Sequence, residues 1–228
     1  MRPEDRKSHL STDEVNPDMR DNSGRTPLWW AAGGGHQEVV ELLLGREDIN
    51  PNMRNENSRT PLLEAAARGY GGVVELLLGW EGIDSDIPDN YGRAPLSWAA
   101  SCGYDKVMKL LLGREDVNPD MPDNDGRTPL SWAAEEGHHG VLKLLLKREE
   151  VNINMPDNDS RTPLSWAAYF GRDRVVKLLL ERKDINPDIP SKGGLTPLLL
   201  ASRNEHKAAV SLLQAQNSPN PNQLNTTI

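Results

Sequence analysis

The sequence repeats itself at a fixed interval, and this constrains the fold more than any other feature. The tripeptide Thr-Pro-Leu, with Ala replacing Thr once, begins at positions 26, 60, 94, 128, 162 and 196, each 34 residues after the one before. Glycines recur in the same register from Gly35 to Gly171. A constant period of this length indicates a chain built from stacked copies of one small structural unit.

The fourth unit shows what each copy is expected to form. Thr128 can cap the free N–H groups at a helix start, and Pro129 suits the first helical position. Gly137 ends this helix after about two turns, and a second helix is expected over residues 139–147, where Val and Leu recur at helical spacing. The following segment is dense in Pro, Asn, Asp and Gly, which is typical of turns. Each unit is therefore predicted to be a helix pair followed by a hairpin-like loop.

Helices this short are marginally stable alone, so each unit must bury its leucines against its neighbours. Ala-Ala steps in the first helix allow a close approach between helices. The sequence therefore predicts an all-α solenoid of stacked helix-turn-helix units with hairpin-like loops. Its contacts should join nearest neighbours, without a single globular core.

The repeated residues resemble a known family. Residues 126–146, in which Gly-Arg-Thr-Pro-Leu-Ser-Trp-Ala-Ala is followed by Gly-His and Val-Leu-Lys-Leu-Leu-Leu, are similar to an ankyrin repeat, as are the five parallel segments. The resemblance covers roughly residues 15 to 213 and implies an ankyrin-repeat solenoid. The period of 34 departs from the commoner length of about 33, and Ser at 97, 131 and 165 replaces the usual His. The Arg-Glu-Asp-Val-Asn-Pro-Asp linkers resemble ankyrin arrays common in fungal proteins, which often follow a nucleotide-binding signalling domain.

Three segments are expected along the chain. Residues 1–20 hold the tail of a degraded N-terminal repeat, because residues 15–19 align one period before residues 49–53. Residues 21–214 form the six-unit array, whose last unit has Glu205 in place of the helix-ending Gly and a more polar second helix. Residues 215–228 form a polar tail that is expected to be disordered.

Composition excludes several classes of protein. No apolar run approaches the roughly 20 residues that span a bilayer, and the N-terminus has no apolar signal region. The single cysteine, Cys102, cannot form an internal disulfide or a Cys-based zinc site, so the expected compartment is the cytoplasm or nucleus. A net charge of −8 disfavours binding to nucleic acid or anionic lipid. We expect a monomer.

No catalytic motif appears in the sequence, and we predict neither enzyme activity nor a cofactor. There is no phosphate-binding Gly loop and no His-Glu-x-x-His helix. His36, His138 and His206 share a column but lie three and two repeats apart, too far to share a metal, so capping or surface roles are expected. The acidic turn ending at Gly126 lacks the ligand spacing of an EF-hand.

Two further columns have readings that the sequence leaves open. Trp30, Trp98, Trp132 and Trp166 stand where related repeats carry a buried Leu, which favours core packing, while Trp29 and Trp80 lie outside that column. In the second unit Glu64 occupies the Trp position, so either it reaches an edge or this unit is the weak point of the stack. Arginines at 25, 59, 93, 127 and 161 run beside aspartates at 21, 89, 123 and 157. These rows are either Arg–Asp ladders between loops or a polar rim that faces a partner.

The leading functional hypothesis is a non-enzymatic scaffold that binds a protein partner of unknown identity. The alternative is a recognition or sensor fragment of a larger fungal-type signalling protein. The resemblance implies partner contacts on the concave face, at the hairpin tips and at the residue pair before each helix-ending Gly. Tyr169 and Phe170 occupy one such pair and are either a contact anchor or local core packing. The candidate residues are Tyr91, Arg93, Asn124, Asp125, Arg127, Glu135, Glu136, Asn158, Asp159, Arg161, Tyr169 and Phe170.

Overall fold

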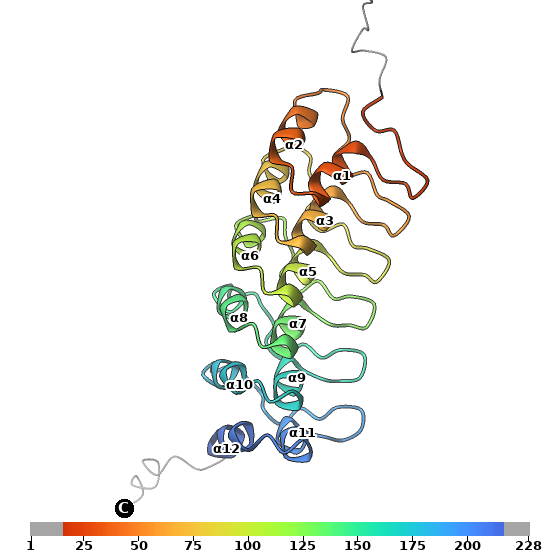
Figure 1. Cartoon of the computed structure of the whole chain (residues 1–228). Coiled ribbons are helices and arrows are strands. Elements are labelled where there is room, and N and C mark those ends of the chain that lie inside the picture. Colours follow the sequence, from red (N-terminus) through yellow and green to blue (C-terminus); the bar gives the residue numbers. More distant parts are fainter. Residues whose placement is uncertain (1–15, 217–228) are drawn as a thin grey trace, which may run out of the picture.

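The computed structural model describes residues 16–216, and this part of the chain is an all-α stack without β-strands (Figure 1). The all-α prediction is confirmed. The helices, two per repeat, are α1 (Pro27–Gly33), α2 (Gln37–Leu44), α3 (Pro61–Arg68), α4 (Gly71–Leu78), α5 (Pro95–Cys102), α6 (Asp105–Leu112), α7 (Pro129–Glu136), α8 (His139–Leu145), α9 (Pro163–Tyr169), α10 (Asp173–Leu180), α11 (Pro197–Arg203) and α12 (Lys207–Gln216).

The helices form two parallel rows. Odd-numbered inner helices lie beside the projecting loops, and even-numbered outer helices line the opposite side (Figure 1). The helix pairs in substantial contact belong either to one repeat or to consecutive repeats, as α5 with α7 and α6 with α8 do. This is the nearest-neighbour packing that the sequence predicted.

The helix ends follow local sequence chemistry. The Thr128 hydroxyl accepts a hydrogen bond from the Ser131 N–H, and Pro129 holds the first helical position of α7. Gly137 ends α7 at a φ of 83°, a left-handed conformation in which a side chain would be strained. In the last repeat Glu205 adopts a φ of 61° at the same position. Helix α8 ends at Leu145, two residues before the expected end.

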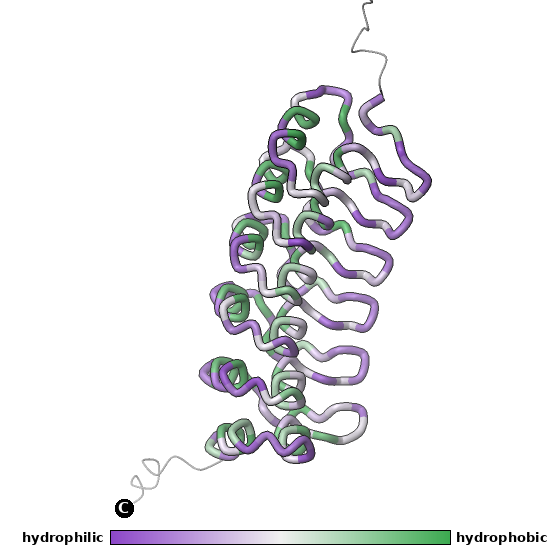
Figure 2. The backbone as a smooth tube through the Cα atoms, in the orientation of Figure 1, coloured by the Kyte–Doolittle hydropathy of each residue, from purple (hydrophilic) through white to green (hydrophobic). Residues whose placement is uncertain are grey.

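The core runs through the whole stack as stripes of leucine and small residues. Leu62, Leu96, Leu130 and Leu164 on the inner helices are at most 1% exposed, and Ala-Ala steps beside them are fully or almost fully buried. Figure 2 shows the hydrophobic positions gathered in the helices and the hydrophilic ones along the loops. The helices therefore supply the stabilising burial, and the loops supply a polar surface.

The two ends of the described region differ from the middle. At the N-terminal end, the Asp18 carboxylate accepts a hydrogen bond from the Asn50 N–H in the next loop, as equivalent residues do further along. Helix α12 continues to Gln216, two residues into the segment that was expected to be tail. The rest of that segment, 217–228, and residues 1–15 of the N-terminal segment lie outside the described residues.

Candidate functional site

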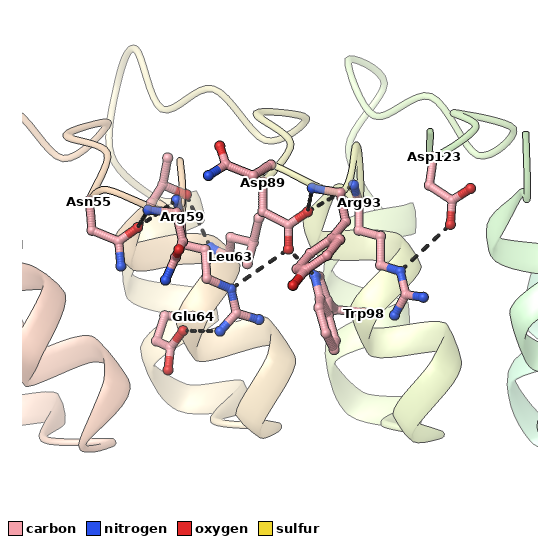
Figure 3. A network of polar contacts seen from close by, with 12 residues as sticks. Asn55, Arg59, Leu63, Glu64, Asp89, Arg93, Trp98 and Asp123 are labelled. Carbon is pink, nitrogen blue, oxygen red and sulfur yellow. Dashed lines mark hydrogen bonds and ion pairs between the residues drawn. The ribbon is translucent and has the colours of Figure 1, made fainter. Parts of the chain in front are cut away.

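One aspartate organises each of four hairpin loops, those of the first, third, fourth and fifth repeats. In the third repeat, Asp89 Oδ1 accepts hydrogen bonds from the N–H groups of Tyr91 at 2.9 Å and Arg93 at 3.1 Å, while Oδ2 accepts the indole N–H of Trp98 at 2.9 Å (Figure 3). The carboxylate thus closes the turn and fixes the orientation of the tryptophan on the next helix. The same Asp–Trp hydrogen bond joins Asp21 to Trp30, Asp123 to Trp132 and Asp157 to Trp166.

These contacts place Trp30, Trp98 and Trp166 at the edge of the stack, where the predicted core role was wrong, whereas Trp132 is buried as predicted. Trp30 is 51% exposed, Trp98 and Trp166 are partly exposed, and only Trp132 of the four is buried, at 8%. The physical reason is the indole N–H, which needs an acceptor that the apolar core lacks and the loop aspartate provides. Trp29, whose role the sequence left open, is the buried one in its pair.

Arginine side chains fill the spaces between successive tryptophans. The Arg93 guanidinium carbon lies 4.9 Å from the ring centroid of Trp98 and 3.6 Å from that of Trp132. Arg127 lies in the same way between Trp132, at 3.4 Å, and Trp166, at 4.1 Å. The result is an alternating Arg–Trp stack that joins the third, fourth and fifth repeats through cation–π contacts.

The ladder interpretation of the Arg and Asp rows is confirmed at two joints between repeats. Arg59 Nε lies 3.8 Å from Asp89 Oδ2, and Arg93 Nε lies 3.6 Å from Asp123 Oδ2. At the following joint the pattern changes, because Arg127 pairs with Glu135 on the helix of the same repeat, and Asp157 has no ion pair with a residue in the described part of the chain. Asp157 still accepts its two loop N–H groups and the indole of Trp166.

In the second repeat, the carboxylate lies on the helix and the loop position carries an amide. Glu64, at the tryptophan position, is 2% exposed and lies 2.6 Å from both Arg59 Nη1 and Arg68 Nε (Figure 3). It is buried and does not reach an edge, so the first sequence expectation for it was wrong, while a weak point of the stack at this unit stays a prediction. Asn55 replaces the loop aspartate and keeps the turn hydrogen bonds, but has no indole to accept. One carboxylate has moved from the loop to the helix, and the charge beside Arg59 is preserved.

Several predicted contact residues hold neighbouring loops together. The Asn124 side chain donates to the Asn90 carbonyl at 2.9 Å, and the Asn158 side chain donates to the Asn124 carbonyl at 3.0 Å. Their backbone N–H groups bond to the preceding loop as well. These two amides therefore keep the loops in register, although both residues remain exposed.

Other predicted residues face solvent on what we call the loop-side surface, formed by the hairpin loops and the adjoining ends of the inner helices. Tyr91 is 70% exposed at its loop tip, and Asp125 and Asp159 are exposed at the next two tips. Tyr169 and Phe170, at the end of α9, are 43% and 38% exposed.

Phe170 packs on its own repeat and is not buried beneath the next hairpin. Its ring lies nearly parallel to that of Trp166, with centroids 6.1 Å apart and an interplanar angle of 11°. Tyr169 meets Phe170 edge-on at 4.9 Å. The two rings therefore extend the Arg–Trp stack outward and remain open on one side.

The structure gathers five of the predicted residues around one open cavity of about 340 Å³. Its lining contains carboxylates and guanidinium groups beside an indole, a polar composition suited to binding. Among residues 16–216 no three His, Cys, Asp or Glu side chains are placed to hold a metal ion. The lining residues are Asp125, Arg127, Asp157, Asn158, Asp159, Arg161 and Trp166.

Two of the three aligned histidines have capping contacts. His138 Nε2 lies 3.1 Å from the Ser101 carbonyl, and His206 Nε2 lies 3.0 Å from the Tyr169 carbonyl. In the fifth repeat Arg172 donates to the Glu135 carbonyl in the same manner, at 2.7 Å. These side chains satisfy the free carbonyls at the end of the preceding inner helix.

None of the helices in the described part of the chain is both long and apolar enough to cross a membrane.

Comparisons with known proteins agree with this architecture. The family model for ankyrin repeats in three copies matches residues 7–89, 47–121 and 96–191, and the single-repeat model matches 193–226. The crystal structure of EF0377, an ankyrin repeat protein, is similar with a TM-score of 0.77 and 22% identity, over 82% of this chain and 96% of that one. An ankyrin repeat domain from Acinetobacter baumannii AYE is similar with a TM-score of 0.76 and 26% identity, over 85% of this chain and 98% of that one. No curated protein matches the sequence significantly.

Proposed function

Because the chain belongs to the ankyrin-repeat family, whose members generally mediate protein–protein interactions without catalysis, we propose that it is a non-enzymatic scaffold that binds a protein partner on its loop-side surface. The observation that supports this most directly is the contrast between a fixed frame and variable tips. The Asp–Trp hydrogen bonds and Arg–Trp stack repeat from unit to unit, whereas the exposed residues around them change.

The frame makes the variable residues rigid. Tyr91 follows an aspartate that caps its loop, and the backbone carbonyl of Tyr91 accepts the Asn124 N–H from the next loop at 3.0 Å. Phe170 rests on Trp166, which is itself held by Asp157. Side chains that are ordered before binding lose less conformational entropy when a partner arrives, which favours affinity.

Site-specific photo-crosslinking tests the location of the partner. We would place p-benzoylphenylalanine at position 91 on the loop-side surface, where it replaces a Tyr, or at position 41 on the outer helix α2, both exposed in the structure. In lysate of the source cells, we expect a discrete crosslinked protein from position 91 and none from position 41. Crosslinking to one protein from position 41 alone would contradict the proposal.

A second experiment addresses the aromatic pair. Replacing both Tyr169 and Phe170 by Ser should weaken capture of the crosslinked partner at least tenfold, about 1.4 kcal/mol, because exposed aromatic residues are the usual anchors of interfaces. Circular dichroism should show an unchanged helix content. A large fall in melting temperature with full partner binding by the folded fraction would assign the pair to packing.

The finer expectations stay predictions. A role as the recognition fragment of a fungal-type signalling protein, a monomeric state, absence of nucleic-acid binding, and a cytoplasmic or nuclear location rest on the sequence alone. Size-exclusion chromatography with light scattering would check the monomer, for which the expected mass is 25.3 kDa.

A further inference from the structure

The exposed rings of Tyr169 and Phe170 form an aromatic patch beside a cavity of defined charge. Phe170 is supported on one face by Trp166, and the Arg172 guanidinium carbon lies 5.9 Å from its centroid. This support holds the patch in place, while more than a third of each residue remains exposed. A fixed pair of exposed aromatic rings is a suitable seat for an apolar side chain of a partner.

The charges next to the aromatic patch do not cancel. Arg161 lies 3.6 Å from Asp159, and Arg127 is paired with Glu135, so these two guanidinium groups are neutralised within the structure. Among residues 16–216, Asp157 has no ion pair, because Arg127, the equivalent of the arginines that bridge to the next loop, pairs with Glu135.

Two further carboxylates add to this excess. Asp125 and Glu136 are exposed, and no ion pair joins either of them to a described residue. Glu136 lies beside Arg172 at a neighbouring cavity, so that guanidinium group offsets one of these charges. The cavity of about 340 Å³ has three carboxylates and two guanidinium groups in its lining and therefore keeps a net negative charge.

The acidic character ends one repeat later. At the tip of the sixth loop Lys192 stands where the third, fourth and fifth loops have Asn, and residues 191–195 contain no carboxylate. A partner on this surface thus meets negative charge at the fourth and fifth repeats and loses it toward the sixth. The direction of this change gives the surface an orientation along the stack.

We propose that the partner segment on this surface is an extended, basic stretch of protein: an apolar side chain packs on the aromatic patch and a Lys or Arg side chain enters the cavity bordered by Asp125, Asp157 and Asp159. This inference rests on the proposed function and specifies its partner. Trp166 lines the cavity, and its ring centroid lies 6.1 Å from that of Phe170. Because an extended chain advances about 3.3 Å per residue, the basic and apolar residues of the partner are at least about two positions apart.

Within the proposal, carboxylates and not indole rings recognise the cation of the partner, because the rings already lie against arginines of this chain. Both faces of Trp132 are covered by Arg93 and Arg127, and Trp166 lies close to Arg127 and Arg161. A partner cation therefore binds through charge and hydrogen bonds to the aspartates. An acidic segment would meet repulsion at the same place.

An array of immobilised random octapeptides, probed with the fluorescently labelled full chain, tests the proposal. We expect the bound peptides to be enriched in Lys or Arg at least about two positions from an aromatic or large aliphatic residue. Replacing the basic residue by Glu in a selected peptide should weaken binding at least tenfold. Raising the salt from 50 to 500 mM should also weaken it, since exposed charges are screened.

Protein variants separate a specific acidic cavity from general charge. Asp125→Asn combined with Asp159→Asn should weaken binding of the selected peptides at least tenfold, whereas Glu41→Gln with Glu181→Gln, two exposed carboxylates of the outer row, should change it less than twofold. Equal losses in the two pairs, or selection of acidic or neutral peptides, would overturn the proposal. If the photo-crosslinked partner still binds the loop-side surface in that case, the proposed function holds and only the basic preference fails. Absence of a crosslink from position 91 would instead overturn both.

Discussion

Converting Asp86 and Asp120 to Asn should stabilise the protein. These residues lie in the linkers that lead into the hairpin loops, in a column that contains Asn at 52 and 154. In every repeat from the first to the fifth this side chain accepts the N–H of the residue 32 positions later, at 2.7–3.1 Å. The Asn side chains make one more bond: Asn52 donates to the Gly82 carbonyl at 2.9 Å and Asn154 to the Asp184 carbonyl at 2.6 Å.

An ionised aspartate cannot make that second bond. Asp86 Oδ1 and Asp120 Oδ1 are buried without any hydrogen-bond partner. By the 34-residue register, the carbonyl groups that an amide would reach are those of residues 116 and 150. Burial raises the pKa of both carboxyl groups, with nearby Asp84 adding to the effect at Asp86 and Glu150 at Asp120. Only the hydrogen bonds from the Asn118 and Asn152 N–H groups oppose the shift.

The expected gain follows from hydrogen-bond energetics. Each Asn adds a bond worth about 1 kcal/mol and removes an unsatisfied buried oxygen, whose cost is about 1–3 kcal/mol. Against this, the N–H groups of Asn118 and Asn152 lose a charged acceptor, which costs about 1–2 kcal/mol, so a net gain of about 1–2 kcal/mol per site is expected. The two substitutions lie in different linkers and should add to within about 0.5 kcal/mol. The double variant is therefore expected to gain about 2–4 kcal/mol at pH 7.

The gain should depend on pH in a defined direction. A raised pKa in the folded state means that each aspartate contributes stability below its unfolded pKa of about 3.9 and loses this contribution as pH rises through the folded value. The free-energy difference between variant and parent should therefore be largest at neutral pH and shrink as pH falls toward 4. Both proteins contain the carboxyl groups with a lowered pKa, such as Asp184 beside Arg182, so the pH dependence that these groups contribute cancels in the comparison.

Urea denaturation followed by circular dichroism at pH 7 and pH 4 measures both quantities. Asp188→Asn is the matched control, because Asp188 holds the same column in the sixth repeat but is exposed, and should change stability by less than about 0.5 kcal/mol. The reverse change, Asn154→Asp, should destabilise. A double variant no more stable than the parent at pH 7, or a gain that is the same at pH 4, would refute the reasoning.

Other predictions follow from the stack. Glu64→Gln should cost about 1–3 kcal/mol in urea denaturation, because Arg59 and Arg68 lose a charged acceptor; an unchanged midpoint would mean that the pair adds nothing. Leu145→Ala, at a fully buried position of α8, should cost about 2–5 kcal/mol by leaving a cavity, measured in the same way. Deleting residues 124–157, one whole period, should leave a shorter array that unfolds cooperatively in calorimetry, and a loss of cooperativity would argue against nearest-neighbour packing. EDTA, Ca²⁺, Zn²⁺ and ATP should each leave the melting temperature unchanged, whereas a rise of several degrees would reveal an unrecognised site.

The architecture was predictable from sequence because its determinants are local. Helix starts such as Thr128-Pro129 and the left-handed end at Gly137 need only a few neighbouring residues, and the constant period carries them through the chain. Nearest-neighbour stacking then follows from helices too short to be stable alone. The exposed tips and the aromatic patch could also be located by register, because the period assigns every residue to a place in the unit.

The roles of the charged and aromatic columns required the three-dimensional arrangement. A tryptophan in an otherwise apolar column is compatible with a core or an edge position. For Trp98, the Asp89 carboxylate nine residues earlier accepts the indole N–H once the loop has folded over the helix, and this places the ring at the edge. The long side chain of Arg127 can reach Glu135, on the helix that follows it, or Asp157, on the next loop. Only the packing of the repeats selects Glu135. The exchange of Asn55 and Glu64 was visible in the sequence as two departures in one repeat, but their link depends on Arg59, which lies between them in space. Backbone geometry is set by short-range chemistry, whereas the partners of long, polar side chains are set by distances between repeats.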